Sequence, residues 1–216
     1  MKHLLIIGAR GFGRAVCDLA SDMPQYLKKF DIKGFLDDKS NALDGYDNYP
    51  PILGPVESYN LQPDDVFICA LGDVCYKKQY AELILNKGGQ FINIIHPSAH
   101  IGRNVQIGNG CIIAGNVWLD SDSQLGDFVT IQCGVLVGHD VKIGNWSIID
   151  GLCVLGGFTQ VEELVTIHTN SSVIPHITIG AESTVNIASV VIRDVKQNSV
   201  VMGNPAREMI IPKKIK

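Results

Sequence analysis

The second half of the chain places an aliphatic residue at every sixth position. The series begins at Ile101 and runs to Val191 through sixteen consecutive positions, each occupied by Ile, Leu or Val. Since these residue types make up roughly one residue in four, an unbroken run of this length has a chance probability on the order of one in a billion. A six-residue unit of this kind predicts short strands joined by regular corners.

A second regularity lies four residues after each aliphatic residue, where the side chain is small or β-branched, as at Val105 and Ser123. Glycine often follows the aliphatic residue directly, as at Gly102 and Gly138, where we expect a tight corner that benefits from a missing Cβ. One unit cannot bury its aliphatic side chain alone, so the units must stack. Three units closing a triangular coil would align the aliphatic residues inside, giving roughly five coils of a parallel β-helix.

The first half of the chain alternates strand and helix patterns. Strands are predicted for residues 2–7, 32–36 and 66–71, and helices for residues 14–21 and 75–87. This order predicts a small parallel sheet whose ligand site lies at the carboxyl ends of the strands. The change of pattern near residue 95 predicts two domains, residues 1–95 and 96–216.

The turn GARGFG, residues 8–13, joins the first strand to the first helix. Its glycines allow close approach to a diphosphate, and the free amides of the helix start attract an anion. Its GxxGxG spacing departs from the dinucleotide pattern GxGxxG, which argues against NAD. Alternatively, these glycines only close tight turns, and Arg10 either pairs with a diphosphate or is solvated. Asp37 and Asp38, after the second strand, could accept hydrogen bonds from ribose hydroxyls.

The overall charge and the cysteine pattern narrow the partners and the compartment. The net charge is −4 with a pI near 5.8, so no nucleic-acid partner is expected. No apolar run suggests a secretory signal or a membrane span. The six cysteines lack CxxC spacing and fall in strand-like segments, which predicts buried reduced thiols and a cytoplasmic protein.

Four segments together give a specific resemblance: GARGFG, FLDD at 35–38, ALGD at 70–73, and NIIHPSAHIG leading into the hexads. This combination resembles the sialic acid O-acetyltransferase and bacillosamine-pathway N-acetyltransferase family of hexapeptide-repeat acyltransferases. The resemblance implies a Rossmann-like nucleotide-sugar-binding domain, a left-handed parallel β-helix and a homotrimer. Family members often carry Ser and His in a GASGHG-like turn, whereas this chain has Arg10 and Phe12.

The resemblance also implies the reaction: an acyl group, expected to be acetyl, passes from acyl-CoA to an amine or hydroxyl of a nucleotide-linked sugar. Acetyl-CoA is then the co-substrate, and no metal is required. The nucleotide sugar is expected to contact the strand ends of the first domain. The expected contact residues are Gly8, Arg10, Gly11, Phe12, Gly13, Asp37, Asp38, Gly72 and Asp73.

Acyl transfer needs a base for the proton of the acceptor, and imidazole suits that role. Among the six histidines, His139 follows the inward-facing Val137 by two residues, and Asp140 stands beside it. The family's catalytic base occupies this register, so the resemblance makes His139 the general base and Asp140 its orienting partner. Adjacent residues of an extended strand point to opposite faces, so Asp140 can help only through a turn. The alternative is an exposed corner histidine with an incidental neighbour.

The resemblance names further residues for acyl-CoA. Ile148 occupies the position where some relatives carry a second histidine, which argues against a two-histidine mechanism. Gly157 matches a position whose amide contacts acyl-CoA, or it is a plain corner glycine. A segment resembling the family's carboxyl-terminal GxPA element is expected near the CoA nucleotide. Its residues of interest are Gly203, Asn204, Pro205 and Arg207.

Two other functions stay open from the sequence. A metal-dependent hydratase related to β-helix carbonic anhydrases would need histidines such as His139, His168 and His176 as ligands. The hexad count puts His139 and His168 on different faces, and no second carboxylate–histidine pattern supports a metal. A non-catalytic sugar-nucleotide-binding protein is the other alternative. Trp118, Trp146 and Phe158 are expected to pack between trimer subunits, although Trp146 could equally line a sugar site.

Overall fold

The computed structural model describes residues 1–209. They form two compact units. The first unit comprises residues 1–98 together with 109–115, and the second comprises residues 99–108 together with 116 onward. None of the described helices has the length and apolarity needed to cross a membrane.

The first unit contains a four-stranded parallel sheet in the order β2-β1-β3-β4. Its strands are β1 (Lys2–Ile7), β2 (Phe30–Leu36), β3 (Asp65–Cys69) and β4 (Gln90–Phe91), and its helices are α1 (Gly11–Ser21) and α2 (Val74–Asn86). The predicted parallel sheet is confirmed. The strand β4 was not predicted, because two residues carry no readable periodicity. The helix α1 begins three residues earlier than predicted, inside the glycine-containing turn.

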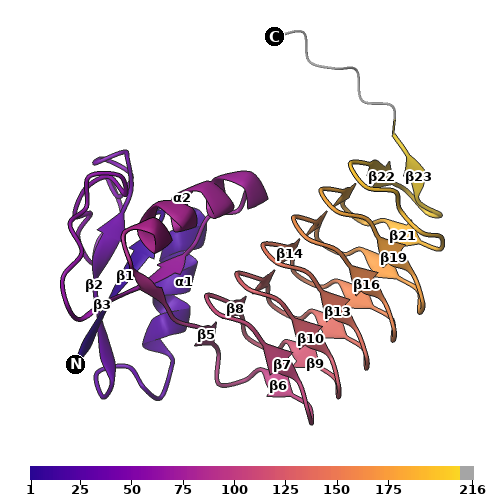
Figure 1. Cartoon of the computed structure of the whole chain (residues 1–216), viewed down its shortest axis with the longest axis horizontal. Coiled ribbons are helices and arrows are strands. Elements are labelled where there is room, and N and C mark those ends of the chain that lie inside the picture. The colour runs from indigo at the N-terminus through magenta and orange to yellow at the C-terminus, as the bar shows by residue number, and fades with distance from the viewer. Residues whose placement is uncertain (210–216) are drawn as a thin grey trace, which may run out of the picture. The chain divides into compact units, whose positions relative to one another are not determined.

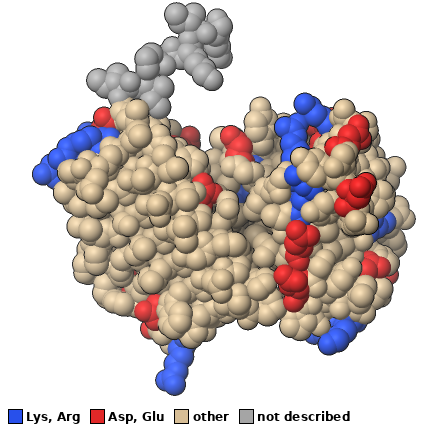
Figure 2. Space-filling model, turned by 180° about the vertical axis from the view of Figure 1, so that it is seen from behind, with Lys and Arg blue, Asp and Glu red and all other residues tan. Residues whose placement is uncertain are grey.

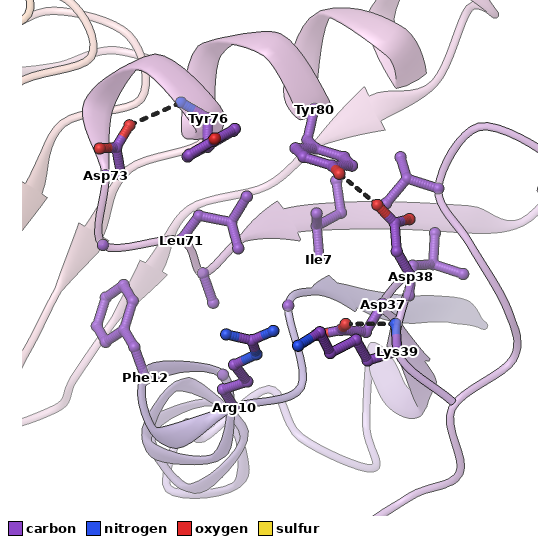
Figure 3. Close-up of a pocket in the computed structure, with 16 residues that line it drawn as sticks. Ile7, Arg10, Phe12, Asp37, Asp38, Lys39, Leu71, Asp73, Tyr76 and Tyr80 are labelled. Carbon is purple, nitrogen blue, oxygen red and sulfur yellow. Dashed lines mark hydrogen bonds between the residues drawn. The ribbon is translucent and has the colours of Figure 1, made fainter. Parts of the chain in front are cut away.

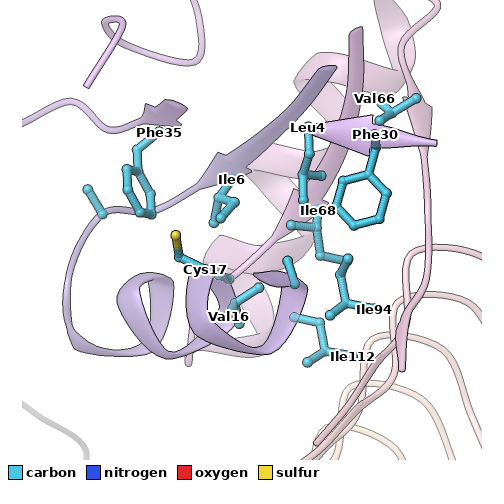
Figure 4. Packing of buried hydrophobic residues seen from close by; sticks show 13 residues of the cluster. Leu4, Ile6, Val16, Cys17, Phe30, Phe35, Val66, Ile68, Ile94 and Ile112 are labelled. Atoms are coloured by element: carbon cyan, nitrogen blue, oxygen red, sulfur yellow. The ribbon is translucent and has the colours of Figure 1, made fainter. Parts of the chain in front are cut away.

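The core of the first unit lies between the sheet and α1 (Figure 4). Leu4 and Ile6 of β1 and Ile68 of β3 are fully buried there, beside Val16 of α1. The same core contains Ile94 of β5 (Ile94–Ile95) and Ile112 of β8 (Ile112–Ile113). Because Ile112 is buried in this core, residues 109–115 belong to the first unit, although they lie within the hexad repeat.

The second unit is a three-faced parallel β-helix whose coils succeed one another from β6 to β22 (Figure 1). We call its sheets faces 1, 2 and 3. Face 1 contains β6 (His100–Ile101), β9 (Trp118–Leu119), β12 (Leu136–Val137), β15 (Val154–Leu155), β18 (Ser172–Val173) and β21 (Val190–Val191). Face 2 contains β7 (Gln106–Ile107), β10 (Gln124–Leu125), β13 (Lys142–Ile143), β16 (Gln160–Val161) and β19 (Thr178–Ile179). Face 3 contains β11 (Thr130–Ile131), β14 (Ile148–Ile149), β17 (Thr166–Ile167), β20 (Thr184–Val185) and β22 (Val200–Met202).

Two columns of side chains fill the β-helix. The aliphatic column predicted from the hexads is inside, with Leu119, Val137 and Leu155 fully buried, but its first residue, Ile101, is 38 % exposed. The small-residue column is buried as well, and its hydroxyl groups are satisfied by backbone carbonyls. Ser147 Oγ, for example, donates to Glu162 O at 2.9 Å. Serine is therefore tolerated in the interior, because its polar atom is hydrogen-bonded.

The corners differ from the prediction. Left-handed backbone occurs three residues after the aliphatic residue, as at Asp140 with φ +57° and Leu152 with φ +62°. The glycines that directly follow the aliphatic residue are not in that conformation. Instead, a Cβ at Gly138 would lie 2.8 Å from the amide nitrogen of Gly157 in the next coil. The expectation of a tight corner at these glycines was wrong, because they permit close stacking of coils.

The last described turn ends the β-helix. The strand β23 (Arg207–Glu208) pairs antiparallel with β22. The turn between them begins at Gly203, whose carbonyl accepts from Val190 N at 2.9 Å, while Ala206 N donates to Val190 O at 2.8 Å. These bonds pair the backbone N–H and C=O of Val190 in β21, which no further coil would pair.

The six cysteines are all free. Four are buried, as predicted, but Cys75 and Cys133 are exposed, so the prediction of uniformly buried thiols was wrong. Cys75 lies in the first turn of α2, and Cys133 lies at a β-helix corner, where side chains point outward.

The turn between β1 and α1 depends on two glycines. Gly8 has a left-handed backbone with φ +96°, and a Cβ at Gly13 would lie 1.9 Å from Gly8 O. At Gly11, in the same turn, an added Cβ would meet no atom of residues 1–209 within 4 Å. The close approach of the helix start to the strand end therefore requires glycine at Gly13 and not at Gly11.

We predict opposite outcomes for alanine at these two sites. Gly13→Ala should lower the free energy of unfolding by about 2 kcal/mol or more, because the methyl group collides with backbone. Gly11→Ala should leave stability unchanged or raise it by about 0.5–1 kcal/mol. Urea denaturation of both variants measures the difference. Equal stability of the two variants would contradict this account of the turn.

A lysine is buried in the first unit. Lys77 of α2 is 1 % exposed, and burial lowers its pKa to about 7, opposed by the nearby thiols of Cys69 and Cys111. Between pH 7 and the ordinary lysine value of 10.5, the unfolded chain binds a proton at this site that the folded chain does not. The stability contributed by this site therefore rises with pH across that window.

We predict that Lys77→Met raises the free energy of unfolding at pH 7 by about 1–3 kcal/mol, because no charge is buried in the variant. The gain should shrink as the pH approaches 10. Urea denaturation of both proteins between pH 7 and 10 tests this expectation. A constant difference between wild type and variant across that range would rule out the proton linkage.

Candidate functional site

A pocket of about 520 Å³ lies in the first unit, where β1, β2 and β3 end (Figure 3). Eight of the nine residues predicted to contact a nucleotide sugar line it, and Gly11 does not. Lys39, Leu71, Tyr76 and Tyr80 also line the pocket and were missed. The sequence contains a signal for three of these missed residues. Lys39 directly follows the acidic pair, and Tyr76 and Tyr80 are four residues apart on one helix face.

The start of α1 opens into this pocket through Arg10, Phe12 and Gly13. Arg10 is the N-cap residue, and its side chain makes no capping hydrogen bond. The first intrahelical bond is donated by Arg14 N to Arg10 O at 2.9 Å, so the three preceding amides have no acceptor within the helix. This geometry suits an anion.

The carboxylates of the pocket are engaged by the protein. Asp37 accepts from Ala9 N and from Lys39 N, both at 2.9 Å, one on each carboxylate oxygen. Asp38 accepts a hydrogen bond from Tyr80 Oη (Figure 3), which raises the pKa of Tyr80 to about 12. Asp73 caps α2 by accepting from Cys75 N and Tyr76 N at 2.9 Å. Asp37 and Asp73 therefore shape the backbone of the pocket.

Two cationic side chains, Arg10 and Lys39, project into the pocket (Figure 3). Within residues 1–209 neither side chain forms an ion pair with a carboxylate. By contrast, Arg14, one turn into α1, lies 3.5 Å from the ring centroid of Tyr46. The positive charges of Arg10 and Lys39 are thus available to a ligand beside the helix start.

His139 and Asp140 form a hydrogen-bonded pair in the second unit. His139 Nδ1 lies 2.9 Å from Asp140 Oδ2, and the two side chains are 54 % and 43 % exposed. The left-handed backbone of Asp140 supplies the turn that adjacent residues need in order to meet. An ionised carboxylate only accepts, so in the neutral imidazole Nδ1 would carry the proton and Nε2 the free lone pair.

Gly157 and Phe158 lie one coil beyond the histidine. A Cβ at Gly157 would be 2.8 Å from His139 Nε2, and the rings of Phe158 and His139 are perpendicular with centroids 5.0 Å apart. Ile148, by contrast, lies on face 3 and is 1 % exposed. The structure brings Gly157 next to His139 but not Ile148.

A groove of about 410 Å³ follows the corner between faces 1 and 2. Asp122, Asp140, Phe158 and His176 line it from the corner, and face 2 contributes Gln124, Lys142, Gln160 and Thr178. His139 is absent from this lining, although its partner Asp140 belongs to it. The pair therefore stands at the edge of the groove.

A second histidine–carboxylate pair occurs at the corner between faces 3 and 1. His168 Nδ1 lies 2.8 Å from Asp150 Oδ2, and Gln132 Nε2 donates to Asp150 Oδ1 at 2.8 Å. This pair was not recognised from the sequence, because its residues are eighteen apart and meet only through stacking. Among residues 1–209 no group of three or more His, Cys, Asp or Glu side chains could hold a metal ion.

The other aromatic candidates are held by local contacts. His96 lies near Ser98 and Asp22, while His100 stacks on Trp118 with centroids 3.8 Å apart. Trp146 stacks on Phe128 at 4.1 Å and is only 8 % exposed, so its expected place on an outer face was wrong.

Of the carboxyl-terminal residues predicted to bind the CoA nucleotide, Gly203, Asn204 and Pro205 lie in the turn between β22 and β23, and Arg207 begins β23. Gly203 has a left-handed backbone with φ +104°. The side chain of Arg207 is exposed, and its Nη1 donates to Ala206 O at 3.0 Å. A ligand role for Asn204, Pro205 and Arg207 stays a prediction.

Comparison with known sequences gives two adjoining matches. Residues 3–84 match the family described as PglD N-terminal domain, and residues 92–190 match the family described as GMPPB C-terminal domain. The chain is 31 % identical to UDP-N-acetylbacillosamine N-acetyltransferase of Bacillus subtilis over 115 residues, 52 % of this chain. The matched region spans 51 % of that enzyme, about half its length.

Comparison with solved structures gives matches along nearly the whole chain. The acetyltransferase domain of PglB from Neisseria gonorrhoeae in complex with acetyl coenzyme A is 27 % identical, with a TM-score of 0.86 over 96 % of this chain and 99 % of that one. PerB from Caulobacter crescentus, solved with CoA and GDP-perosamine, is 24 % identical with a TM-score of 0.86, over 97 % and 98 % of the two chains. The resemblance drawn from the sequence is therefore confirmed: this chain has the fold of the bacillosamine-type sugar acetyltransferases, a small Rossmann-like sheet followed by a left-handed parallel β-helix.

Proposed function

We propose that this chain transfers an acetyl group from acetyl-CoA to an amine of a nucleotide-linked sugar, with His139 as the general base. The observation that carries the proposal is the His139–Asp140 pair at the edge of a groove on a β-helix. The relative from Bacillus subtilis is named an N-acetyltransferase, and the gonococcal domain was solved with acetyl coenzyme A. These names favour an amine over a hydroxyl as acceptor.

The chemistry requires one proton to be moved. The acceptor nitrogen attacks the thioester carbonyl carbon, and its proton passes to His139 Nε2, which carries the free lone pair. This attack forms the C–N bond of a tetrahedral intermediate, whose collapse restores the carbonyl and breaks the C–S bond to leave the amide. The proton on Nε2 then neutralises the departing thiolate, so CoA leaves as the free thiol. Asp140 keeps Nδ1 protonated and stabilises the imidazolium during this cycle.

The pocket of the first unit suits the nucleotide diphosphate of the acceptor. The amides at the start of α1 and the side chains of Arg10 and Lys39 offer positive potential without a competing ion pair. A planar guanidinium and the helix start are both well matched to phosphate oxygens. Within residues 1–209 the side chain of Asp38 is bound only by Tyr80 Oη, and it is the carboxylate we assign to a ribose hydroxyl.

We also propose that the protein is a homotrimer packed through face 1 in the cytoplasm. Face 1 presents Trp118, Leu136 and Val154, which are 48 %, 46 % and 41 % exposed. Large exposed apolar residues also flank this face at its two corners, as at Leu152 on one side and Phe158 on the other. The β-helix, at the left of Figure 2, shows a surface with few charged side chains. Such a surface favours association, and six free thiols suit a reducing compartment.

A thiol-release assay tests the activity directly. Purified protein is incubated with acetyl-CoA and, in turn, with UDP-, GDP- and dTDP-linked 4-amino sugars and their 4-hydroxy counterparts. We expect thiol release and an acetylated product with at least one amino sugar. Binding of a nucleotide sugar without thiol release from any pair would indicate a binding protein and overturn the proposal.

We predict that His139→Gln lowers kcat by about 10²- to 10⁴-fold, because glutamine cannot accept the proton. Asp140→Asn should lower kcat less and leave the KM for acetyl-CoA within about twofold, because it removes orientation and not the base. Steady-state kinetics with His3→Gln as control measures these effects. Full activity of His139→Gln would require a different base.

We predict that Arg10→Gln and Lys39→Gln each raise the KM for the nucleotide sugar by about tenfold, since each removes one charged contact to phosphate. Neither variant should change the KM for acetyl-CoA. Calorimetric binding of the free nucleoside diphosphate gives the same comparison without catalysis. Unchanged affinity in both variants would place the diphosphate elsewhere.

A further inference from the structure

The imidazole of His139 is bordered by the next coil of the β-helix. Phe158 N donates to His139 O at 3.0 Å, and His176 N donates to Gly157 O at 3.0 Å. These bonds fix His139, Gly157 with Phe158, and His176 in three successive coils of one corner. Backbone pairing thus decides which side chains touch the ring.

Glycine at position 157 is not explained by backbone conformation. Gly157 is absent from the residues with left-handed backbone, so any residue could adopt its local geometry. A Cβ there would lie 2.8, 2.9 and 3.2 Å from Nε2, Cε1 and Cδ2 of His139. The missing side chain therefore leaves room for the ring atoms opposite Nδ1, including the nitrogen with the free lone pair.

An aromatic ring at position 158 is not explained by the corner either. Phe158 has a left-handed backbone with φ +60°, and Leu152 and Leu164 hold the same corner position with φ +62° and +57°. Leucine thus satisfies the corner as well as phenylalanine does. Phe158 differs in its ring, which lies perpendicular to His139 at 5.0 Å and stacks parallel on His176 at 4.8 Å.

We infer that Gly157 and Phe158 are positioning residues for His139: the glycine clears the space that the imidazole occupies, and the phenylalanine ring, backed by His176, fixes its plane. Asp140 holds the ring at Nδ1, so the three contacts together leave one orientation. The inference rests on the proposed function in assigning a reaction to the histidine. The positioning itself concerns the ring alone and can be measured without substrate.

A double-mutant cycle with Gly157→Ala, His139→Ala and the double variant tests the glycine. Gly157→Ala should lower kcat by about a hundredfold, since a displacement near 1 Å has that effect on a catalytic group. In the His139→Ala background the same change should have no further effect on residual kcat or on CoA affinity, measured by calorimetry. Gly151→Ala is the matched control: it occupies the same hexad position, and Cys133 O, at 3.2 Å, is the only described atom that its Cβ would meet within 4 Å.

The cycle separates this role from direct contact with acyl-CoA. If the Gly157 amide or the space beside it binds the thioester, Gly157→Ala should weaken CoA binding in both backgrounds, and that result would overturn the inference. If His139→Ala keeps full activity, the proposed function fails. The positioning of the ring is then decided by the NMR resonances of the His139 imidazole in the second test alone.

Phe158→Leu and Phe158→Tyr form the second test. Leucine should shift the ¹⁵N and ¹H imidazole resonances of His139 and alter the pH profile of kcat/KM, whereas tyrosine should preserve both, because the ring is retained. Gly157→Ala should shift the same resonances. Unperturbed His139 signals in both Gly157→Ala and Phe158→Leu, with melting temperatures close to that of wild type, would refute the inference.

Discussion

The structure depends on parallel pairing between residues eighteen apart, by which each coil stacks on the one before it. Leu136 lies opposite Trp118, and Val154 lies opposite Leu136, so every position of a coil has the equivalent position above and below it. This pairing joins parts of the chain that are distant in sequence. The stability of the stacked coils therefore depends on the burial of one aliphatic side chain per hexad. Residues eighteen apart therefore form columns along the β-helix, and the neighbours of a functional side chain include the residues at equivalent positions in the adjacent coils.

The candidate catalytic corner illustrates the consequence. His139 takes its carboxylate from the next residue, because the corner has a left-handed backbone at Asp140. It takes its remaining neighbours from the next coil, because Gly157 occupies the equivalent position. At the opposite edge of face 1, His168 instead takes its carboxylate from Asp150, one coil earlier. One scaffold therefore builds histidine–carboxylate pairs in two ways, and only the first way places a glycine against the ring.

The periodic features of this fold were predictable from the sequence, and the features that depend on stacking were not. The inward column, the parallel sheet and most residues of the pocket follow from local patterns. The glycines that directly follow many of the aliphatic residues were misinterpreted, because they are required by the close backbone of the following coil. Trp146 was misplaced and the His168–Asp150 pair was missed for the same reason. Counting in steps of eighteen would have found that pair and would have placed Gly157 over His139.

At both candidate sites a glycine without a Cβ allows two backbone segments to lie close together. Gly13 lets the start of α1 approach the end of β1, which directs the free helix amides into the pocket. Gly157 lets one coil approach the imidazole of another, which leaves Nε2 unobstructed. In neither case does the glycine adopt a backbone that other residues avoid, so the absent Cβ is what matters. Two segments of backbone can thereby approach each other closely and hold a binding or reactive group in place, without adding a polar contact that would compete with the ligand.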